Sequence, residues 1–305
     1  MIATEQEIVS VVISTYNGAE FISEQLESII HQTYSNLEII VADDASTDDT
    51  IRILKSYAEK DKRIIIYQRD TNAGYNVSFS EVCSKATGAF VAISDQDDIW
   101  KPDKIEKQLK KIKENANTVL VHCISARFEE KSSPHLGSIK KMNFFRGNDI
   151  KCFYLANYVL GHTMLFRRLL LETTLPFPPN IYYDWWLAAN ACSVGNIECV
   201  NEILVWHRMH QSNATGTAKP KIYFKEQTRS TLSTVLSIPD IPVHDWQLGM
   251  HLLKKYQQFD GRFSWPVFWL LFTNAPILFA HKRRVFPWIS YLKHSWRYAR
   301  ASTLA

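Results

Sequence analysis

The stretch FVAISDQDDIW, residues 90–100, is the most informative part of this sequence. Phe90 to Ser94 suit a buried strand, the acidic group Asp95-Gln96-Asp97-Asp98 follows it, and Pro102 opens a helix soon afterwards. Adjacent carboxylates at the end of a buried strand repel one another unless a cation binds there. Oxygen ligands favour a hard divalent cation such as Mg²⁺ or Mn²⁺, and such an ion suits a diphosphate.

The flanking sequence predicts the sheet in which this stretch lies. Apolar runs typical of strands occur at residues 7–13, 37–42, 64–68 and 90–94, and residues 20–31, 47–59 and 76–85 between them are predicted to be helical. Strands that alternate with helices indicate an α/β fold with a mostly parallel sheet. The polar residues after Ile13, Ala42 and Ser94 are therefore expected to meet at one edge, where ligands bind. Alone, the acids of residues 95–98 could equally favour the positive end of a helix dipole.

The residue types at this edge predict a nucleotide diphosphate as ligand. Tyr16 offers a ring on which a base can stack, and Asp43 offers a carboxylate that can accept from a pyrimidine imide N–H. Asp95 and Asp97 offer a metal site for the diphosphate. No glycine-rich phosphate loop follows any predicted strand, which argues against dinucleotide-binding and P-loop proteins.

Three motifs together resemble glycosyltransferase family 2: Ser14-Thr15-Tyr16-Asn17-Gly18, Val41-Ala42-Asp43-Asp44-Ala45-Ser46, and Ser94 to Trp100. Tyr183-Asp184-Trp185-Trp186-Leu187 resembles the acceptor-side motif of its bacterial rhamnosyltransferase-like members. Arg208-Met209-His210, continuing through Asn213 and Gly216, resembles the segment that closes over the donor in those members. His207 departs from that pattern, where tyrosine is usual, and so do Met209 and Gln211.

The resemblance implies a GT-A (Rossmann-like) fold flanked by helices, a nucleotide-sugar donor and inversion at the anomeric carbon. It implies that Asp184 is the general base and that Asp95, Asp97 and His210 hold Mg²⁺ or Mn²⁺. The residues expected on the donor side are Ser14, Thr15, Tyr16, Asn17, Asp43, Asp44, Asn72, Gly74, Asp95 and Gln96. Those expected on the acceptor side are Gly161, His162, Trp185 and Trp186.

Each of these roles has a structural alternative. Asp184 could cap a helix at 185–194, and Asp43 or Asp44 could start the helix after Thr47. Tyr16 could be an ordinary turn residue, and His210 could be structural. The segment Gly161 to Met164 resembles a strand entry that lines the acceptor site, but an ordinary turn before a helix at 167–173 fits it equally.

The composition indicates one catalytic domain with an appendage. The chain has 305 residues, of which 46% are hydrophobic and 22% charged, as in ordinary globular proteins. We expect a catalytic domain at 1–220, with a donor half at about 1–115 and an acceptor half at about 116–220, and a helical region at 221–305. Mobile segments are expected at 129–147 and 216–220, and residues 239–242 are expected to lead into the C-terminal helices.

The C-terminal residues are strongly basic although the net charge is only +4. Residues 261–305 contain seven Lys and Arg residues and no acid, which leaves 28 basic against 31 acidic residues in the rest of the chain. Aromatic residues are interleaved with them, and this pattern is typical of a segment in an anionic membrane interface. The apolar run at 265–280 is too short to span a bilayer, so peripheral docking is expected. Nucleic acid is not an expected partner, whereas a packed helical pair or a homodimer face is the alternative.

The remaining features concern location. No signal peptide is evident at the amino end, and the five cysteines are scattered without a C-x-x-C pair, so a reduced compartment without a zinc site is expected. Together with the resemblance to glycosyltransferase family 2, these features predict an enzyme on the cytoplasmic, inner face of the cell membrane that builds surface polysaccharide on a lipid carrier. The resemblance to the rhamnosyltransferase-like members implies dTDP-L-rhamnose as the donor, with a UDP-hexose as the alternative. A nucleotidyltransferase and a catalytically inactive membrane partner are the hypotheses from other classes.

Overall fold

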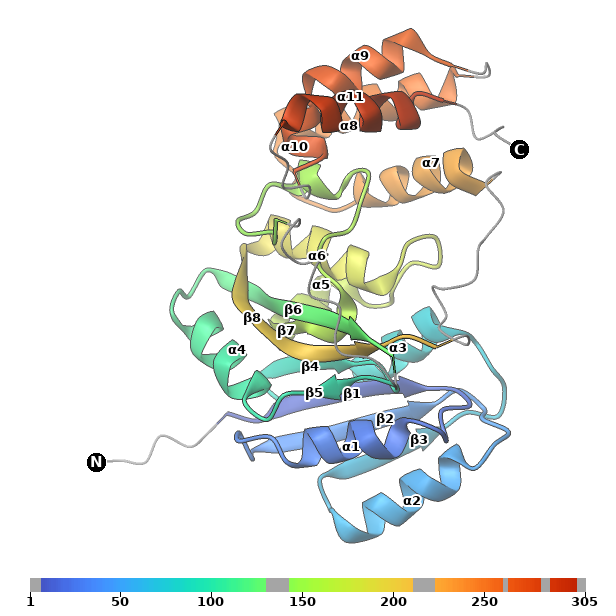
Figure 1. The fold of residues 1–305 in the computed structure, drawn as a ribbon, viewed down its shortest axis with the longest axis vertical. Helices are drawn as coiled ribbons and strands as arrows, with labels where there is room; N and C mark the ends of the chain where they lie inside the picture. The colour runs from blue at the N-terminus through green and yellow to red at the C-terminus, as the bar shows by residue number, and fades with distance from the viewer. Residues whose placement is uncertain (1–6, 130–142, 211–222, 260–262, 281–285, 301–305) are drawn as a thin grey trace.

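A computed structural model describes residues 7–129, 143–210, 223–259, 263–280 and 286–300. An eight-stranded sheet in the order β3-β2-β1-β4-β7-β6-β8-β5 forms its centre (Figure 1). The strands are β1 (Val9–Thr15), β2 (Leu37–Asp43), β3 (Ile64–Gln68), β4 (Phe90–Ser94), β5 (Ile99–Trp100), β6 (Thr118–Phe128), β7 (Met164–Arg167) and β8 (Asn196–Arg208). The predicted α/β class with a mostly parallel sheet is confirmed.

The first four strands form a parallel half-sheet because apolar residues line both of their faces. In β1, Val9, Val11 and Ile13 pack into one hydrophobic cluster, and Val12 packs into the other. One face is covered by α1 (Ile22–Ile30), α2 (Thr50–Lys60) and α4 (Lys104–Lys113), and the other by α3 (Tyr75–Ser84) and α6 (Tyr183–Val194). A sheet buried on both faces needs apolar residues at every position, which explains the continuous apolar runs.

The second half of the sheet is mixed and reverses direction. Strand β7 is antiparallel to both β4 and β6, whereas β6 and β8 are parallel to each other. The helix given as an alternative at 167–173 begins only at Leu171, because Met164–Arg167 is the strand that joins the two halves. A 3-10 turn, Arg168–Leu170, and the short helix α5 (Leu171–Thr174) follow it.

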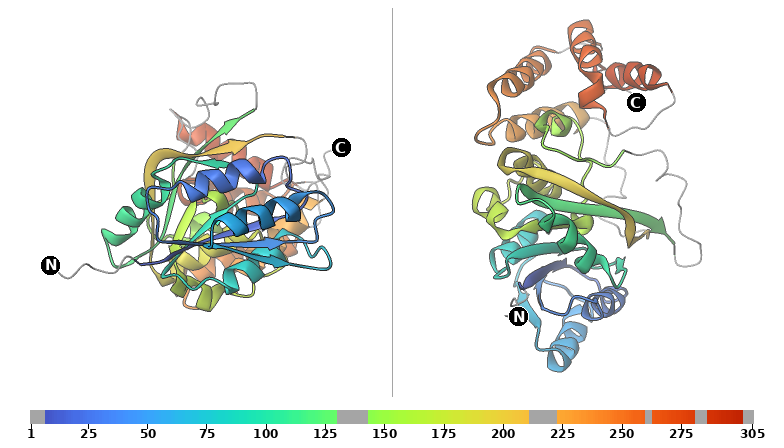
Figure 2. Two further views of the ribbon diagram at one scale, coloured as in Figure 1. Left: turned by 90° about the horizontal axis from the view of Figure 1, so that it is seen from below. Right: turned by 90° about the vertical axis from the view of Figure 1, so that its left-hand side faces the viewer.

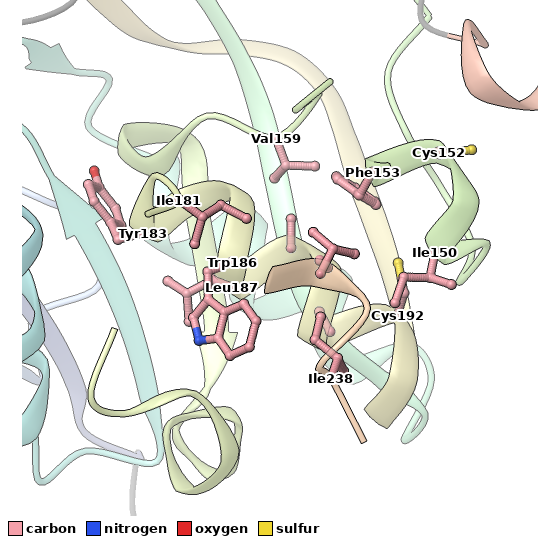
Figure 3. Packing of buried hydrophobic residues seen from close by; sticks show 14 of the residues in the cluster. Ile150, Cys152, Phe153, Val159, Ile181, Tyr183, Trp186, Leu187, Cys192 and Ile238 are labelled. Atoms are coloured by element: carbon pink, nitrogen blue, oxygen red, sulfur yellow. The ribbon is translucent and has the colours of Figure 1, made fainter. Parts of the chain in front are cut away.

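Helices beyond the sheet complete the second hydrophobic cluster. They are α7 (Tyr223–Val235), α8 (Val243–Gln257), α9 (Trp265–Thr273), α10 (Ala275–Leu278) and α11 (Pro287–Tyr298), and they lie at the end of the molecule away from α2 (Figure 2). In Figure 3, Ile238 approaches Trp186 and Leu187 of α6, which joins the helices to the sheet layer. Residues 239–242 connect α7 to α8, so one helix of the region expected at 221–305 precedes them. All five cysteines are buried free thiols.

No helix in the described ranges is both long and apolar enough to cross a bilayer. Of the segment expected to close over the donor, Arg208 to His210 are described, whereas the rest, with Asn213 and Gly216, lies outside the described residues, as does the hinge expected at 216–220. Most of the mobile loop expected at 129–147 lies outside them too.

Candidate active site

The predicted polar clusters meet at the carboxyl ends of β1, β2 and β4, on the right of Figure 1. Because β1 pairs with both neighbours, Thr15 lies beside Asp43 in register and Ile13 beside Ser94. The loops that follow these strands are tied to one another by hydrogen bonds. The backbone N–H of Tyr16 and the hydroxyl of Thr15 both donate to Gln96 Oε1, at 2.9 and 2.7 Å.

Asn17 joins the first loop to the second. Its backbone N–H donates to Ser46 Oγ at 2.9 Å, and its side-chain oxygen accepts from the Thr47 N–H at 2.8 Å. Gly18 lies so close to Gln96 that an added Cβ would be 2.5 Å from the Gln96 Oε1 atom. Ser14 instead faces α3, where its hydroxyl donates to Ser78 Oγ at 2.8 Å.

Asp43 has the geometry expected of a base-binding carboxylate. The residue is fully buried, and its Oδ2 atom accepts from the Ser46 N–H at 3.0 Å. Its Oδ1 atom is also buried and accepts no hydrogen bond from the described residues. A buried acceptor without a hydrogen bond costs free energy, so this oxygen is suited to accept from an N–H group of a ligand. The ring of Tyr16 is 45% exposed next to this loop.

Asp44 holds the loop that follows β3. Its two carboxylate oxygens accept from the N–H groups of Ala73 and Gly74 at 2.9 and 2.8 Å. Asn72 donates to the backbone oxygen of Asp44 at 3.2 Å. Gly74 has a backbone φ of 84°, a value that residues with a Cβ rarely adopt. Asp44, Asn72 and Gly74 thus form one structural unit beside Asp43, and direct contact of this unit with the donor stays a prediction.

The acidic stretch after β4 crowds three carboxylates together. Burial, followed by the neighbouring charges of Asp95 and Asp98, raises the pKa of Asp97 above its ordinary value. The Nε2 atom of His210 lies 2.7 Å from Asp97 Oδ2 and moderates this effect. A divalent cation would relieve the repulsion, and carboxylate oxygens with one imidazole are suitable ligands for Mn²⁺ or Mg²⁺. The described residues therefore fit the metal that the sequence predicts.

A second Asp and His group, which the sequence analysis missed, lies directly beside these acids. Asp98 is fully buried, and its Oδ1 atom is 3.0 Å from His207 Nδ1. His162 Nδ1 is 3.2 Å from Asp95 Oδ2 and 3.7 Å from Asp98 Oδ2, and the two imidazole rings stack at 4.8 Å. Ligand atoms of Asp98, His162 and His207 all lie within 4.8 Å of one another, a spacing that could hold a metal ion.

Electrostatic interactions within this group shift the pKa values of its members. Burial opposes the charged form of His162, but Asp98 and then Asp95 outweigh it and raise the pKa of His162 to about 9. Burial likewise opposes ionisation of Asp98, but His162, His207 and the Arg208 N–H hold its pKa below the ordinary value. His162 is therefore an imidazolium between two carboxylates at neutral pH. The departure from tyrosine at position 207 was the only signal of this group in the sequence.

Asp184 lies in the first turn of α6, whose N-cap residue is Tyr182, so Asp184 is not the helix cap. Its Oδ1 atom accepts from the Trp185 N–H at 2.7 Å, and its Oδ2 atom accepts from the Gly161 N–H at 3.3 Å. Burial raises the pKa of Asp184 to about 6, although these hydrogen bonds oppose the rise. A carboxylate with this pKa is suited to accept a proton near neutral pH.

The two tryptophans expected on the acceptor side point into the protein. The Trp185 indole donates to the Phe153 backbone oxygen at 2.7 Å, and the Trp186 indole donates to the Thr174 backbone oxygen at 2.9 Å. Trp186 is buried among the residues drawn in Figure 3. Trp186 therefore supports the position of α6, and a direct contact of either ring with an acceptor stays a prediction.

Arg208, at the end of β8, was predicted only as part of the closing segment, and its contacts with the acidic stretch were not predicted. Its guanidinium lies 4.8 Å from the ring centres of both Phe21 and Phe128, and it pairs with Glu24 on α1. Its Nε–H donates to the Asp97 backbone oxygen at 3.1 Å, and its backbone N–H donates to Asp98 Oδ1 at 3.2 Å. Arg208 thus holds the acidic stretch in place through these two hydrogen bonds.

These contacts form one continuous path across the site. Asp43 connects through Ser46 to Asn17, and Tyr16 connects through Gln96 to the acidic stretch. Asp95 faces His162, and the preceding residue, Gly161, donates to Asp184. Asp43, the acidic stretch and Asp184, for which base binding, cation binding and proton acceptance are predicted, are thereby held along one edge of the sheet.

The chain is similar in sequence to known glycosyltransferases. The family model described as Glycosyl transferase family 2 matches residues 10–175. The putative teichuronic acid biosynthesis glycosyltransferase TuaG of Bacillus subtilis is 39% identical over 34% of this chain and 41% of its own length.

Two solved structures share the fold. TarS 1-349 of S. aureus in complex with UDP-GlcNAc matches 95% of this chain and 81% of its own at 18% identity, with a TM-score of 0.63. The mannosyltransferase PcManGT of Pyrobaculum calidifontis, in complex with GDP-Man and Mn²⁺, matches 98% of this chain and 86% of its own at 19% identity, with a TM-score of 0.60. The expected GT-A fold is confirmed by these likenesses.

Proposed function

The chain belongs to glycosyl transferase family 2, whose model matches more than half of its residues, and we propose that it is a metal-dependent, inverting hexosyltransferase. The observation that carries the proposal is the path of contacts from Asp43 to Asp184, along which the acids for base, metal and proton follow one another. A nucleotidyltransferase loses its support, because the family match covers the whole donor half.

The proposed reaction transfers one sugar from a nucleotide-diphosphate sugar to a saccharide hydroxyl. Asp43 Oδ1 accepts the imide N–H of the base, and Tyr16 packs against the base. A divalent ion held by Asp95, Asp97 and His210 would neutralise charge on the diphosphate. Asp184 takes the acceptor hydroxyl proton as that oxygen attacks the anomeric carbon from the side opposite to the diphosphate. The bond to the diphosphate breaks in the same step, so the configuration inverts.

The proposed donor is dTDP-L-rhamnose, and a UDP-hexose is the alternative. The motifs Asp95 to Trp100 and Asp184 to Trp186 resemble the rhamnosyltransferase-like members, which supports the first. The likeness to a UDP-GlcNAc complex supports the second, and the GDP-Man complex with Mn²⁺ supports the use of a metal. The proposed acceptor is a growing bacterial surface polysaccharide on a lipid carrier, in keeping with the teichuronic acid assignment of the Bacillus relative.

The experiment that tests this function is nucleotide release from a panel of nucleotide sugars by the purified protein with Mn²⁺ or Mg²⁺. We expect nucleotide release that depends on the metal and that Asp97→Ala abolishes. In Asp184→Asn, we expect this release to persist while transfer to the acceptor is lost. Asp240→Asn is the matched control, because Asp240 lies on a turn between α7 and α8, away from the sheet edge. The proposal fails if wild-type protein releases no nucleotide from any donor, or if Asp184→Asn transfers sugar at the wild-type rate.

We also propose that the enzyme docks peripherally on the inner face of the cell membrane through residues 261–305. On α9 and α11, tryptophan side chains project outward beside the exposed basic residues of α11, Lys293 and Arg297. The exposed fractions are 56% for Trp265, 56% for Trp269, 60% for Trp288 and 42% for Trp296. Tryptophan with basic residues suits an anionic bilayer interface. Phe268 and Leu271 of α9 are buried, so docking would not require the helix to leave the protein.

Vesicle binding tests the docking surface. Trp269→Ser with Trp288→Ser is expected to weaken binding to phosphatidylglycerol vesicles by about tenfold or more. Trp246→Ser on α8, where the ring is 42% exposed, is the matched control. Unchanged vesicle binding together with a loss of dimer in the double variant would favour the homodimer face instead.

A further inference from the structure

Two tyrosines from distant parts of the chain stack next to Asp184. Tyr75 begins α3, and Tyr182 immediately precedes α6. Their ring centres are 6.0 Å apart and their planes differ by 17°, so the two rings are close to parallel. Tyr75 is 41% exposed, Tyr182 is partly exposed, and neither belongs to the two buried hydrophobic clusters. An exposed aromatic pair that adds nothing to the core calls for another explanation.

Asn76 fixes the two tyrosines relative to each other. Its side-chain N–H group donates to the backbone oxygens of Pro178 and Ile181 at 3.0 and 2.6 Å. Its side-chain oxygen accepts from the Tyr183 N–H at 3.1 Å. These three bonds fasten the start of α3 to the segment that leads into α6. The pair is therefore preorganised, and its rings do not have to be ordered when a ligand binds.

The pair is also fixed relative to the proposed proton acceptor. Tyr182 is two residues before Asp184, and the intervening Tyr183 is buried, with its ring 4.2 Å from that of Phe79 on α3. Burial, and then the charges of Tyr182 and Asp184, raise the pKa of Tyr75 to about 12, so the Tyr75 hydroxyl lies within the electrostatic reach of Asp184. Tyr75 accordingly stays a neutral hydrogen-bonding group at neutral pH.

We propose that Tyr75 and Tyr182 form a stacking platform for the sugar residue of the acceptor whose hydroxyl Asp184 deprotonates. This inference rests on the proposed function and deepens it. The apolar C–H face of a pyranose packs on aromatic rings, while ring-edge hydroxyls hydrogen-bond to the sugar's rim. The acidic donor-side residues connect to Asp184 through His162 and Gly161, which are not part of the tyrosine pair. The substrate class assigned to the platform is a pyranoside acceptor, not the nucleotide.

The test combines kinetics with direct detection of sugar contact. With methyl glucopyranosides, galactopyranosides, mannopyranosides and rhamnopyranosides as probes, we expect saturation-transfer NMR to show the C–H protons of at least one of them against wild-type protein. In Tyr75→Ala with Tyr182→Ala this signal should vanish, and the KM for that glycoside should rise by about tenfold. The donor KM and acceptor-independent nucleotide release should stay within about twofold of wild type.

Two further variants guard against misfolding. Tyr75→Phe keeps the stacking ring and should retain the saturation-transfer signal. Val77→Ala, at an exposed position on the same helix, should leave both readouts unchanged. An unaltered acceptor KM in the double alanine variant, an equal rise in donor KM, or no signal from any glycoside with wild-type protein would overturn the platform. Failure of the proposed function is recognised separately, as absence of metal-dependent nucleotide release from wild-type protein.

Discussion

Replacing Asp184 by asparagine is expected to stabilise the protein while it abolishes transfer. Burial raises the pKa of Asp184 from an ordinary 3.8 to about 6. The folded state therefore favours the protonated form, and at pH 8 the ionised carboxylate destabilises the fold by about 3 kcal/mol. Asparagine carries no charge, so it avoids this penalty. It still accepts from the Trp185 N–H but offers an amide N–H group toward the Gly161 N–H, which costs about 1 kcal/mol.

The expected gain is thus about 1–2 kcal/mol at pH 8, measured by urea unfolding with a chelator present so that no bound cation shifts the pKa of Asp184. Because the folded pKa of Asp184 lies above the unfolded value, the contribution of Asp184 to wild-type stability falls as the pH rises through about 4 to 6. The gain in the variant should therefore disappear below about pH 4, where only the cost of about 1 kcal/mol at the Gly161 N–H remains. An Asp184→Asn protein no more stable than wild type at pH 8 would refute the inference of a buried, raised-pKa base.

The carboxylate of Asp184 should also govern how the wild-type rate of sugar transfer depends on pH. This rate should decline tenfold per pH unit below about pH 6. A pH–rate profile with its midpoint near pH 4 would exclude Asp184 as the base. Asp97→Ala should abolish metal-dependent nucleotide release, which means a loss of at least about 100-fold, and titration with Mn²⁺ would detect any metal affinity that persists. Asp43→Asn should raise the donor Kd by about tenfold in a binding titration, since the amide cannot serve both Ser46 and a base N–H as acceptor; an unchanged Kd would place the base elsewhere. Arg208→Gln removes stacking on Phe21 and Phe128, so it should cost about 2–3 kcal/mol of unfolding free energy, and a urea midpoint equal to wild type would contradict this structural role.

The donor half was predictable because its strands are short, apolar and separated by amphipathic helices. Ile64–Gln68 and Phe90–Ser94 have the predicted bounds, and β2 is one residue longer than expected. In such a half-sheet, the local pattern also predicts the edge at which ligands bind, since the carboxyl ends of all the parallel strands lie there. The meeting of the loops after Ile13, Ala42 and Ser94 follows from that rule alone.

The acceptor half was not predictable in the same way. Strands β6 and β8 are long, and polar residues such as His122 and Glu202 interrupt their apolar pattern. Register shifts between the two strands weaken the period-two signal further. Strand β8 brings His207 and Arg208 to Asp98, more than a hundred residues earlier in the chain, and no local pattern encodes such a contact. The raised pKa of His162 likewise depends on Asp98 and Asp95, which lie far from it in the sequence, so His162 was assigned only to the acceptor side.

The number of residues at the end of β8 is fixed by successive contacts. Trp206 is paired with Ile99 across the sheet, and two residues later the Arg208 N–H is bonded to Asp98. His210 then faces Asp97. Adding or deleting one residue between 206 and 210 would turn successive side chains to the opposite face and exchange the positions of imidazole and guanidinium. Homologous proteins that keep this chemistry should consequently vary in length at surface turns such as the one at Asp240, and never within these five positions.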